Sequence, residues 1–596
     1  MIRPVFIALS LVGIATSGVI FKSRPFNSKS NCALEVDAAA YKEYKAKLKN
    51  VNREIYKDPI AVCFAPGTPP SVVNAFTQAM QATQGWPTPS QNQYQLGTRW
   101  TGNQGDPFTV RWSFVPDNLQ IPGGAGEPDA GSTLFASMDA KFGGNRAAWI
   151  AKFEEMFARW SEVSGLKYVR VQSGTDPWDD NAAWGQPGAD GLRGDVRIGM
   201  HTIDGPSGIL GYNQFPQNGD MVIDAAESWG QSNGNYRFLF NVLAHEHGHG
   251  MGLFHVCPIQ GTKLMEPFYD DGYYGPQQDD IRASQRLYGD NREPDNSIAT
   301  ASLVGAFTQT SDITLGNIIN ANNATSLSID ANGEEDFFKI TLTSAARLTA
   351  TVTPVGTTYQ SGPQQGNCDT GTSTNALNQA DLAIEIQNSS GAVLASASSN
   401  PSSQAEVAAA DLVAAGTYYV RVHETNAPTQ SQLYRLRLQG SNASGIITGT
   451  VTFQDWVSAN SSLPITVEVR NATTQALVGA VNTTTNSLGQ YYVVIPGMSA
   501  NTSYKVSVNG LMWLRRSQTV TTPGTISISG LNFTVPNGDT DGSGEVDASD
   551  IDAVIAAFGL SIGAPGFQFV RDIDGSGEVD ASDIDVVIAN FGTTDD

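Results

Sequence analysis

Four of the six histidines in the chain lie within eleven residues, in the segment AHEHGHGMGLFH from Ala244 to His255. Residues 242–244 are apolar, and neither proline nor glycine occurs from there to Gly248, which predicts a buried helix. On that helix His245 and His249 lie one turn apart on the same face. Two imidazoles at this spacing can reach one zinc ion.

The same segment supplies a third ligand and a base. Gly252, three residues after His249, suits a left-handed turn that ends the helix, after which the chain can bring His255 to the ion. Three imidazoles leave one zinc position open for water. Glu246 is beside the first ligand, does not coordinate the ion, and can take a proton from that water. We therefore predict His245, His249 and His255 as ligands of one catalytic zinc and Glu246 as general base.

Two other interpretations of the cluster are ordinary surface histidines and a closed structural zinc site. The two-histidine helix alone would leave both open, whereas the full His-Glu-x-x-His-x-x-Gly-x-x-His pattern favours a catalytic site. We predict no metal role for His247, because it is two residues beyond His245 and points to nearly the opposite side of the helix.

The chain has 596 residues, enough for roughly three to five domains. Residues 1–22 contain Arg3, an apolar run and then small residues near Ala15, which is typical of a secretory signal peptide. The alternative is an uncleaved membrane anchor, since the run nearly reaches spanning length. Polar and glycine interruptions favour cleavage, so we expect a secreted, extracellular chain associated with a cell surface. No other segment is apolar enough to span a membrane in the mature chain.

The net charge of −23 argues against nucleic acid or an anionic membrane as a partner. Residues 537–596 hold fourteen acidic residues and one basic residue, so they supply thirteen of these charges. An exported chain with four cysteines can form two disulfides, and the sequence leaves three pairings open among Cys32, Cys63, Cys257 and Cys368.

The histidine pattern resembles that of the metzincin metalloproteases, and the downstream sequence is similar to the matrixin group. In KLMEPF, Met265 and Pro267 resemble the family's Met-turn beneath the zinc, and the DDI and LYG signatures occur at 279–281 and 287–289. The segment FTVRWSF at 108–114 resembles the family's first strand. The resemblance implies an α+β metzincin catalytic domain that hydrolyses peptide bonds within polypeptide substrates, with an edge strand that holds the substrate extended.

The resemblance also implies a structural calcium at Asp204, Asp224 and Glu227, since carboxylates and loop carbonyls suit a hard cation. The family's structural zinc is predicted to be absent, with His201 left as a lone histidine. Matrixins are usually kept latent by a cysteine in a PRCGxPD segment, which this chain lacks. Cys63 is the substitute, through a thiolate at the zinc, although a disulfide with Cys32 or Cys257 is the favoured interpretation.

Beyond the protease segment the composition shifts to threonine, serine, alanine, asparagine and glycine with alternating apolar residues, which predicts antiparallel sandwiches. The signals at 336–338 and 416–419 resemble the bacterial pre-peptidase C-terminal domain. Residues 446–536 resemble carboxypeptidase-regulatory-like sandwiches. Neither sandwich is given a ligand, and both are interpreted as spacers or stabilising modules.

The acidic tail is an internal repeat with a period of 33 residues, DTDGSGEVDASDIDAVIAAFG and DIDGSGEVDASDIDVVIANFG. Its oxygen donors have the spacing of an EF-hand calcium loop, at Asp539, Asp541, Ser543, Asp547 and Asp550, and at Asp572, Asp574, Ser576, Asp580 and Asp583. Each loop is predicted to enter one helix with one apolar face, lined by Ile551, Val554, Ile555 and Phe558 in the first and by Ile584, Val587, Ile588 and Phe591 in the second. A disordered acidic tail would fit the charge but not these duplicated faces.

No helix precedes either loop, and the repeat therefore resembles type I dockerin, a small α module with two calcium ions. That resemblance implies docking to a cohesin-like scaffold or cell-surface protein, with calcium binding coupled to folding.

The sequence thus predicts a multidomain chain, with an α+β metzincin catalytic domain, two all-β sandwich domains and a small α calcium-binding module. The expected segments are a signal peptide (1–22), a pro-region (23–95), a matrixin-like metalloprotease (96–292), a pre-peptidase C-terminal-like sandwich (293–441), a carboxypeptidase-regulatory-like sandwich (445–536) and dockerin-like repeats (537–596). The function is that of a secreted zinc metalloendopeptidase. The alternative is a calcium-dependent adhesion or scaffold protein with an inactive protease-like domain, which the presence of Glu246 disfavours.

Overall fold

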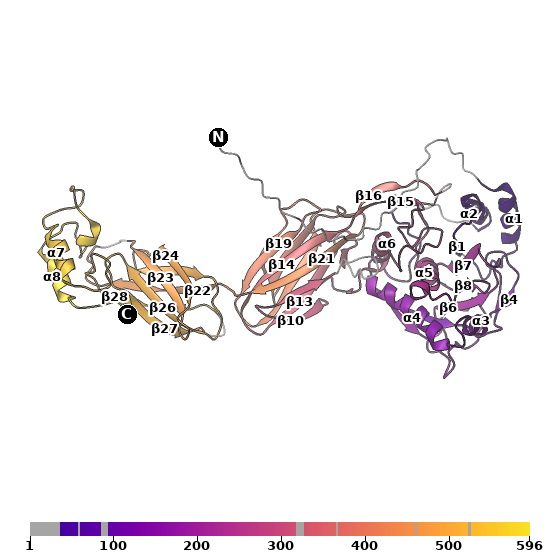
Figure 1. The fold of residues 1–596 in the computed structure, drawn as a ribbon, viewed down its shortest axis with the longest axis horizontal. Coiled ribbons are helices and arrows are strands. Elements are labelled where there is room, and N and C mark those ends of the chain that lie inside the picture. The colour runs from indigo at the N-terminus through magenta and orange to yellow at the C-terminus, as the bar shows by residue number, and fades with distance from the viewer. Residues whose placement is uncertain are drawn as a thin grey trace, which may run out of the picture.

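The computed structural model describes residues 36–57, 60–84, 93–316, 327–364, 368–458, 462–522 and 526–596. The predicted signal peptide and Cys32 lie outside these residues. Figure 1 shows a mixed α/β region, two β-sandwiches and a terminal pair of helices arranged in a row along the long axis. This order of elements confirms the predicted multidomain fold class.

The α/β region contains six helices and nine strands within the described residues. The helices are α1 (Ala38–Leu48), α2 (Pro70–Gln84), α3 (Leu134–Lys141), α4 (Arg146–Val163), α5 (Asn233–Gly250) and α6 (Gln278–Tyr288). The strands are β1 (Ile60–Phe64), β2 (Phe108–Phe114), β3 (Gln120–Ile121), β4 (Ala130–Gly131), β5 (Leu166–Arg170), β6 (Val196–His201), β7 (Ile209–Gln214), β8 (Met221–Asp224) and β9 (Val256–Cys257).

Six of these strands form one sheet in the order β1-β7-β8-β6-β2-β5. The β5, β2, β6 and β8 strands run parallel to one another, and β7 is antiparallel to β8. At the far edge, β1 pairs antiparallel with β7. A strand from the predicted pro-region therefore completes the sheet beside the helix that carries the histidines.

The main core of this region lies between the sheet and helices α4 and α5. Phe153, Met156 and Trp160 of α4 are completely buried, as their helical spacing predicts. A second core lies under α1 and α2, where Val62 and Phe64 of β1 pack with Phe76 of α2. The N-terminal segment is thus packed against the rest of the α/β region through its own apolar core.

The first sandwich consists of two packed sheets, in the orders β10-β13-β20-β17-β18 and β11-β21-β14-β19, with β12 also pairing with β21. Its strands are β10 (Ser302–Phe307), β11 (Asp312–Leu315), β12 (Leu327–Ile329), β13 (Glu335–Leu342), β14 (Ala346–Val355), β17 (Leu382–Asn388), β18 (Val393–Ala397), β19 (Glu406–Leu412), β20 (Gly416–Glu424) and β21 (Gln432–Ser441). Alternate residues of β14 are buried, as expected for a strand with one face in the core.

An arm of this sandwich reaches back to the α/β region. It consists of β15 (Thr358–Pro363) and β16 (Thr372–Asn375), and β15 pairs antiparallel with β9. A disulfide joins Cys257 of β9 to Cys368 in the arm. A disulfide of Cys63 with Cys257, one of the two favoured alternatives, is therefore wrong; among the described residues the thiol of Cys63 is free, and a bond to Cys32 stays a prediction. Because residues 257 and 368 are 111 positions apart, no local signal could have indicated this pair.

The second sandwich and the terminal module complete the chain. The sandwich strands are β22 (Gly445–Phe453), β23 (Pro464–Asn471), β24 (Leu477–Thr484), β25 (Gln490–Ile495), β26 (Ser503–Gly510), β27 (Arg516–Thr521) and β28 (Phe533–Val535), in sheets β25-β22-β28 and β24-β23-β26-β27. The terminal module contains α7 (Ala548–Ile555), the short helix η1 (Phe569–Arg571) and α8 (Ala581–Ala589). Among the described residues, no helix combines the length and apolarity that crossing a membrane requires.

Candidate active site

The histidine segment lies at the end of α5, as the sequence predicts. The residue after the helical C-cap, Gly252, has a φ of 108°, and a side chain there would collide with the carbonyl oxygen of Thr98. Gly248 leaves room for the side chain of Met265, which packs directly beneath the helix. The turn at Gly252 reverses the chain, and His255 follows immediately.

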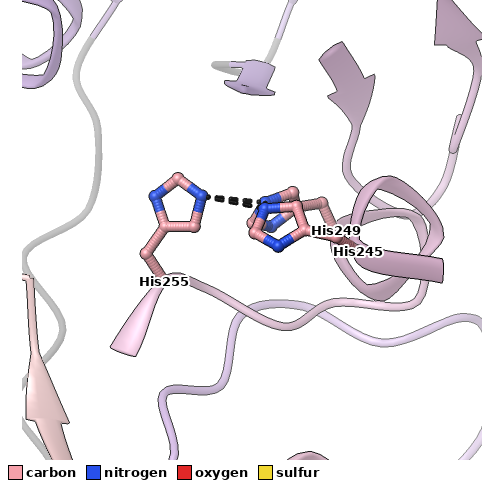
Figure 2. A group of neighbouring side chains, drawn as sticks. All are labelled: His245, His249 and His255. Carbon is pink, nitrogen blue, oxygen red and sulfur yellow. Dashed lines mark hydrogen bonds between the residues drawn. The ribbon is translucent and has the colours of Figure 1, made fainter. Parts of the chain in front are cut away.

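The structure brings the Nε2 atoms of His245, His249 and His255 together (Figure 2). The three Nε2–Nε2 distances are 3.1, 3.2 and 3.2 Å. An ion ~2.0–2.1 Å from each nitrogen, the usual Zn–N distance, fits above such a triangle with a fourth tetrahedral position free. The donor set therefore fits zinc.

Each imidazole is held by an acceptor at its other nitrogen. The Nδ1 atoms of His245 and His249 lie 2.7 Å from the carbonyl oxygens of Leu264 and Leu253, respectively. The Nδ1 atom of His255 lies 2.9 Å from Oε1 of Gln364 in the sandwich arm. These acceptors place the proton on Nδ1 and leave the Nε2 lone pair for a metal. Burial lowers the pKa of His245 to about 3, which keeps the imidazole neutral.

Glu246 is completely buried beside the three imidazoles. Its Oε1 accepts a hydrogen bond of 3.0 Å from the backbone N–H of Cys63, and within the described chain its Oε2 has no hydrogen-bond partner. Burial raises the pKa of Glu246 well above its usual value. A carboxylate with one free oxygen next to a metal-binding cluster is placed to accept a proton.

The two other histidines of the α/β region lie outside the cluster. The Nε2 atom of His247 is 2.7 Å from the hydroxyl of Tyr168, and its ring packs edge-on against Phe157. The Nε2 atom of His201 is 3.0 Å from Oε1 of Glu127. Both rings have a protein partner in the core.

Sequence reasoning missed the carboxylate that positions the Met-turn. Asp280, in the DDI signature of α6, accepts hydrogen bonds from the backbone N–H groups of Leu264 and Met265, at 2.7 and 3.1 Å. Its neighbour Asp279 accepts from Tyr359 and Ser361 of the arm. The signature itself was the available signal, since two adjacent carboxylates that begin a buried helix require partners.

The predicted calcium residues of the α/β region lie around one loop. Oδ2 of Asp224 accepts from the backbone N–H groups of Asp204 and Gly205, at 3.1 and 3.2 Å. Asp204 accepts from Ile209, and Glu227 accepts from Ser207. These three carboxylates are not among the groups of potential metal ligands that gather within 4.8 Å in the described chain. A calcium ion there stays a prediction.

In each terminal repeat, three of the five predicted donors gather as potential metal ligands, and the other two form hydrogen bonds with nearby backbone groups. Asp539, Asp541 and Asp550 form one group within 4.8 Å, and Asp572, Asp574 and Asp583 form the equivalent group. The hydroxyls of Ser543 and Ser576 donate to the carbonyls of Glu545 and Glu578. Asp547 and Asp580 cap α7 and α8 by accepting from Ser549 and Ser582, at 2.7 Å each.

The predicted apolar faces of these helices are only partly buried. Val554 and Val587 are fully buried, with Leu514 of the preceding sandwich in the same core. Ile555 and Phe558 are 53% and 56% exposed, and the equivalent Ile588 and Phe591 are 55% and 56% exposed. The helical spacing predicts one shared apolar face for each set of four, and in the structure the core of the module covers only part of that face.

The first sandwich carries a further potential cation site that sequence reasoning missed. Ligand oxygens of Glu293, Glu334 and Asp336 lie within 4.8 Å of one another, and Asp330 lies beside them. All four residues are buried, and within the described chain both carboxylate oxygens of Asp330 and Oδ1 of Asp336 have no hydrogen-bond partner. Burial and the neighbouring carboxylates raise the pKa of Asp330. Such a group suits a divalent cation. Glu293 lies some forty positions before the other three residues in the sequence, so no single motif marked the site.

The fold thus places three convergent imidazoles and a buried carboxylate at the end of one helix. Comparison with known families identifies the parts of the chain. Residues 138–289 match the family model for Matrixin, residues 334–424 match the bacterial pre-peptidase C-terminal domain, and residues 537–592 match the dockerin type I domain. These matches confirm three of the four predicted resemblances, and the resemblance of residues 446–536 to carboxypeptidase-regulatory-like sandwiches stays a prediction.

Several curated relatives each match about a quarter to a third of this chain. The hatching enzyme of Paracentrotus lividus is 34% identical over 139 residues (23% of this chain and 22% of that protein). Human neutrophil collagenase is 35% identical over 147 residues (24% and 29%), and mouse stromelysin-3 is 33% identical over 189 residues (30% and 36%). The chain therefore spans between about a fifth and about a third of the length of these relatives.

Among solved structures, a type II cohesin–X–dockerin complex from Acetivibrio cellulolyticus is 20% identical, with a TM-score of 0.20. The match covers 25% of this chain and 97% of that chain. A TM-score of this size supports no conclusion on its own.

Proposed function

We propose that the protein is a secreted zinc-dependent endopeptidase that is attached to a cohesin-bearing scaffold by its C-terminal repeats. The observation that carries the proposal is the triangle of Nε2 atoms from His245, His249 and His255 with the free Oε2 of Glu246 beside it. The matrixin match over residues 138–289 supports the same reaction class.

In the proposed reaction, zinc when bound polarises the scissile carbonyl group and lowers the pKa of a water molecule. The three imidazoles hold the ion, and their Nδ1 hydrogen bonds fix the ring orientations. Glu246 accepts the proton of the attacking water and passes it to the leaving amide nitrogen. Where β1 does not occupy it, the edge of β7 would hold the substrate as an added strand.

The docking part of the proposal rests on the dockerin type I match at residues 537–592. Each repeat gathers three aspartates that can hold one calcium ion, which gives two ions in the module. Each repeat also exposes an equivalent apolar pair, at 555 and 558 and at 588 and 591, which offers a surface to a protein partner. A calcium at Asp204, Asp224 and Glu227 would be an additional stabilising ion.

The test is cleavage of casein by the purified full chain with and without a chelator, beside the Glu246→Ala variant. We expect cleavage by the zinc-loaded wild type only, while both proteins bind zinc equally. Equal inactivity of both zinc-loaded proteins would contradict the proposal and would favour the calcium-dependent adhesion or scaffold protein. A pull-down with a purified cohesin module, in calcium and in chelator, tests the docking part separately.

A further inference from the structure

Strand β1 lies across the candidate active site, with its backbone held on two sides. On one side it pairs antiparallel with β7, from Ile60 opposite Gln214 to Cys63 opposite Gly211. On the other side, Phe64 forms a parallel β-bridge with Phe268, in the segment after the Met-turn. The N–H of Phe64 donates a hydrogen bond of 3.2 Å to the carbonyl of Pro267, and its carbonyl accepts one of 3.1 Å from the N–H of Tyr269. An extended chain held in this way adopts the conformation of a peptide added to a sheet edge.

The register of β1 places one peptide bond at the catalytic groups. The N–H of Cys63 donates to Oε1 of Glu246 at 3.0 Å. The backbone of Val62, the residue before Cys63, lies next to the His255 ring. The bond from Val62 to Cys63 thus has its carbonyl side toward the imidazole cluster and its nitrogen side toward the carboxylate. A peptide hydrolase of the proposed type requires this arrangement at the bond that it cleaves.

The contact between β1 and the site is made through the backbone. Sγ of Cys63 lies within 4.8 Å of ligand atoms of His245 and Glu246, and it is not part of the group formed by the three histidines. Val62 and Phe64 on either side pack into the core below α1 and α2. The strand is therefore held by its peptide groups and by flanking side chains, and a thiolate on the metal is not needed to explain its position.

We propose that β1 is an intramolecular substrate and that the protease cleaves its own chain between Val62 and Cys63. This inference rests on the proposed function. One water is consumed: its oxygen forms a bond to the carbonyl carbon of Val62, and the bond from that carbon to the nitrogen of Cys63 breaks. Glu246 transfers the proton of the water to that nitrogen. The products are a Val62 carboxylate and a Cys63 amine.

The main experiment follows the intact mass of the full chain, purified without metal, after zinc is added. We expect a new N-terminus at Cys63, formed at a rate that does not change over a 100-fold range of protein concentration. Glu246→Ala is expected to stay intact. Cys63→Ser is expected to be cleaved at the same position, because the backbone carries the interaction, whereas a thiolate-dependent interaction would be lost.

A second measurement is independent of activity and uses the metal-free Glu246→Ala chain, with peptide mapping to separate Cys63 from Cys32. We expect alkylation of Cys63 to be at least about 100-fold slower than in the urea-unfolded chain, because labelling requires local opening. Adding Val62→Pro is expected to remove most of this protection, since proline is not tolerated within a paired strand. Val62→Ile is the matched control and is expected to keep it. Zinc binding by both variants verifies that they are folded.

Each other result overturns the inference. Cleavage at another bond, a rate that rises with protein concentration, or rapid alkylation of Cys63 in the folded chain would show that β1 is not a substrate in its own site. If casein is cleaved while the bond between Val62 and Cys63 stays intact, the inference fails and the proposed function stands. If the zinc-loaded chain cleaves neither, both fail.

Discussion

The imidazole cluster and the acidic loops of the terminal repeats both gather metal-ligand atoms, but the ligands of the first region are neutral and those of the second are charged. The three histidines are buried and neutral, and each ring is fixed by an acceptor at Nδ1. In the repeats, carboxylates such as Asp539, Asp541 and Asp550 gather within 4.8 Å of one another. Neutral rings do not repel one another, so packing alone can hold them, whereas carboxylates at this distance repel until a cation neutralises them.

This difference suggests that zinc contributes mainly to the reaction and calcium mainly to the stability of the fold. We expect zinc to enter a preformed site and to add chemistry with little change in fold. We expect calcium to contribute most of the folding free energy of the terminal module. The following predictions test this contrast, from the largest expected effect to the smallest.

The largest effect is expected for Glu246→Gln. The amide has the shape of the carboxylate but cannot accept the proton, so kcat should fall ~10²–10⁴-fold, the usual contribution of a general base. Because the site is preformed, zinc affinity and melting temperature should stay close to those of the wild type. Steady-state kinetics on a peptide and a zinc titration measure both. A large loss of zinc affinity would show that the zinc site is not preformed.

Removal of calcium is expected to unfold the terminal repeats while the protease part stays folded. At a calcium concentration of 100–1,000 times the dissociation constant, the ion stabilises the module by about 3–4 kcal/mol, and this is lost in a calcium-selective chelator. Hydrogen exchange at α7 and α8, compared with α4, is the measurement. Equal protection of α7 with and without calcium would contradict the expectation that calcium stabilises the fold of this module.

Gln364→Ala tests how far the zinc site depends on the sandwich arm. Loss of the acceptor for Nδ1 of His255 should lower zinc affinity ~10–100-fold. The matched control is Gln360→Ala, an exposed position on β15, which should leave the affinity unchanged. Competition with a chromogenic chelator measures both variants. An unchanged affinity in Gln364→Ala would mean that the ring is positioned by packing alone.

Glu334→Gln tests the buried acidic group of the first sandwich. Without calcium the variant should be more stable than the wild type by about 1–2 kcal/mol, because one buried charge is removed from among others of the same sign. With calcium it should be less stable, because a ligand is lost. Thermal unfolding in calcium and in chelator gives the two signs. The same sign in both conditions would exclude a cation at this group.

The smallest effect separates the two roles within one loop. Asp547→Ala removes the cap of α7 and should cost about 1 kcal/mol. Asp541→Ala removes a member of the gathered group and should reduce calcium affinity by more than Asp547→Ala does. Isothermal titration with calcium compares the two. The reverse order would restore Asp547 as a principal ligand.

The parts of the site that could be predicted are those in which spacing along the chain sets spacing in the fold. Residues 245–255 and the repeated loops are of this kind, since one helix or one loop places all of their ligands. Gln364 and the strand at 60–64 could not be predicted, because each reaches the site across more than a hundred residues. The partial exposure of Phe558 could not be predicted either. Helical periodicity shows which face of the helix a side chain lies on, but it does not show how much of that face the neighbouring chain covers.

The arm that carries Gln364 and Cys368 has a practical consequence. A recombinant chain trimmed after residue 292 would retain the three clustered imidazoles, yet it would lack the amide that orients one of them and would leave Cys257 with an unpaired thiol. A shortened chain that keeps both contacts therefore has to extend through the first sandwich, which ends with β21 at Ser441.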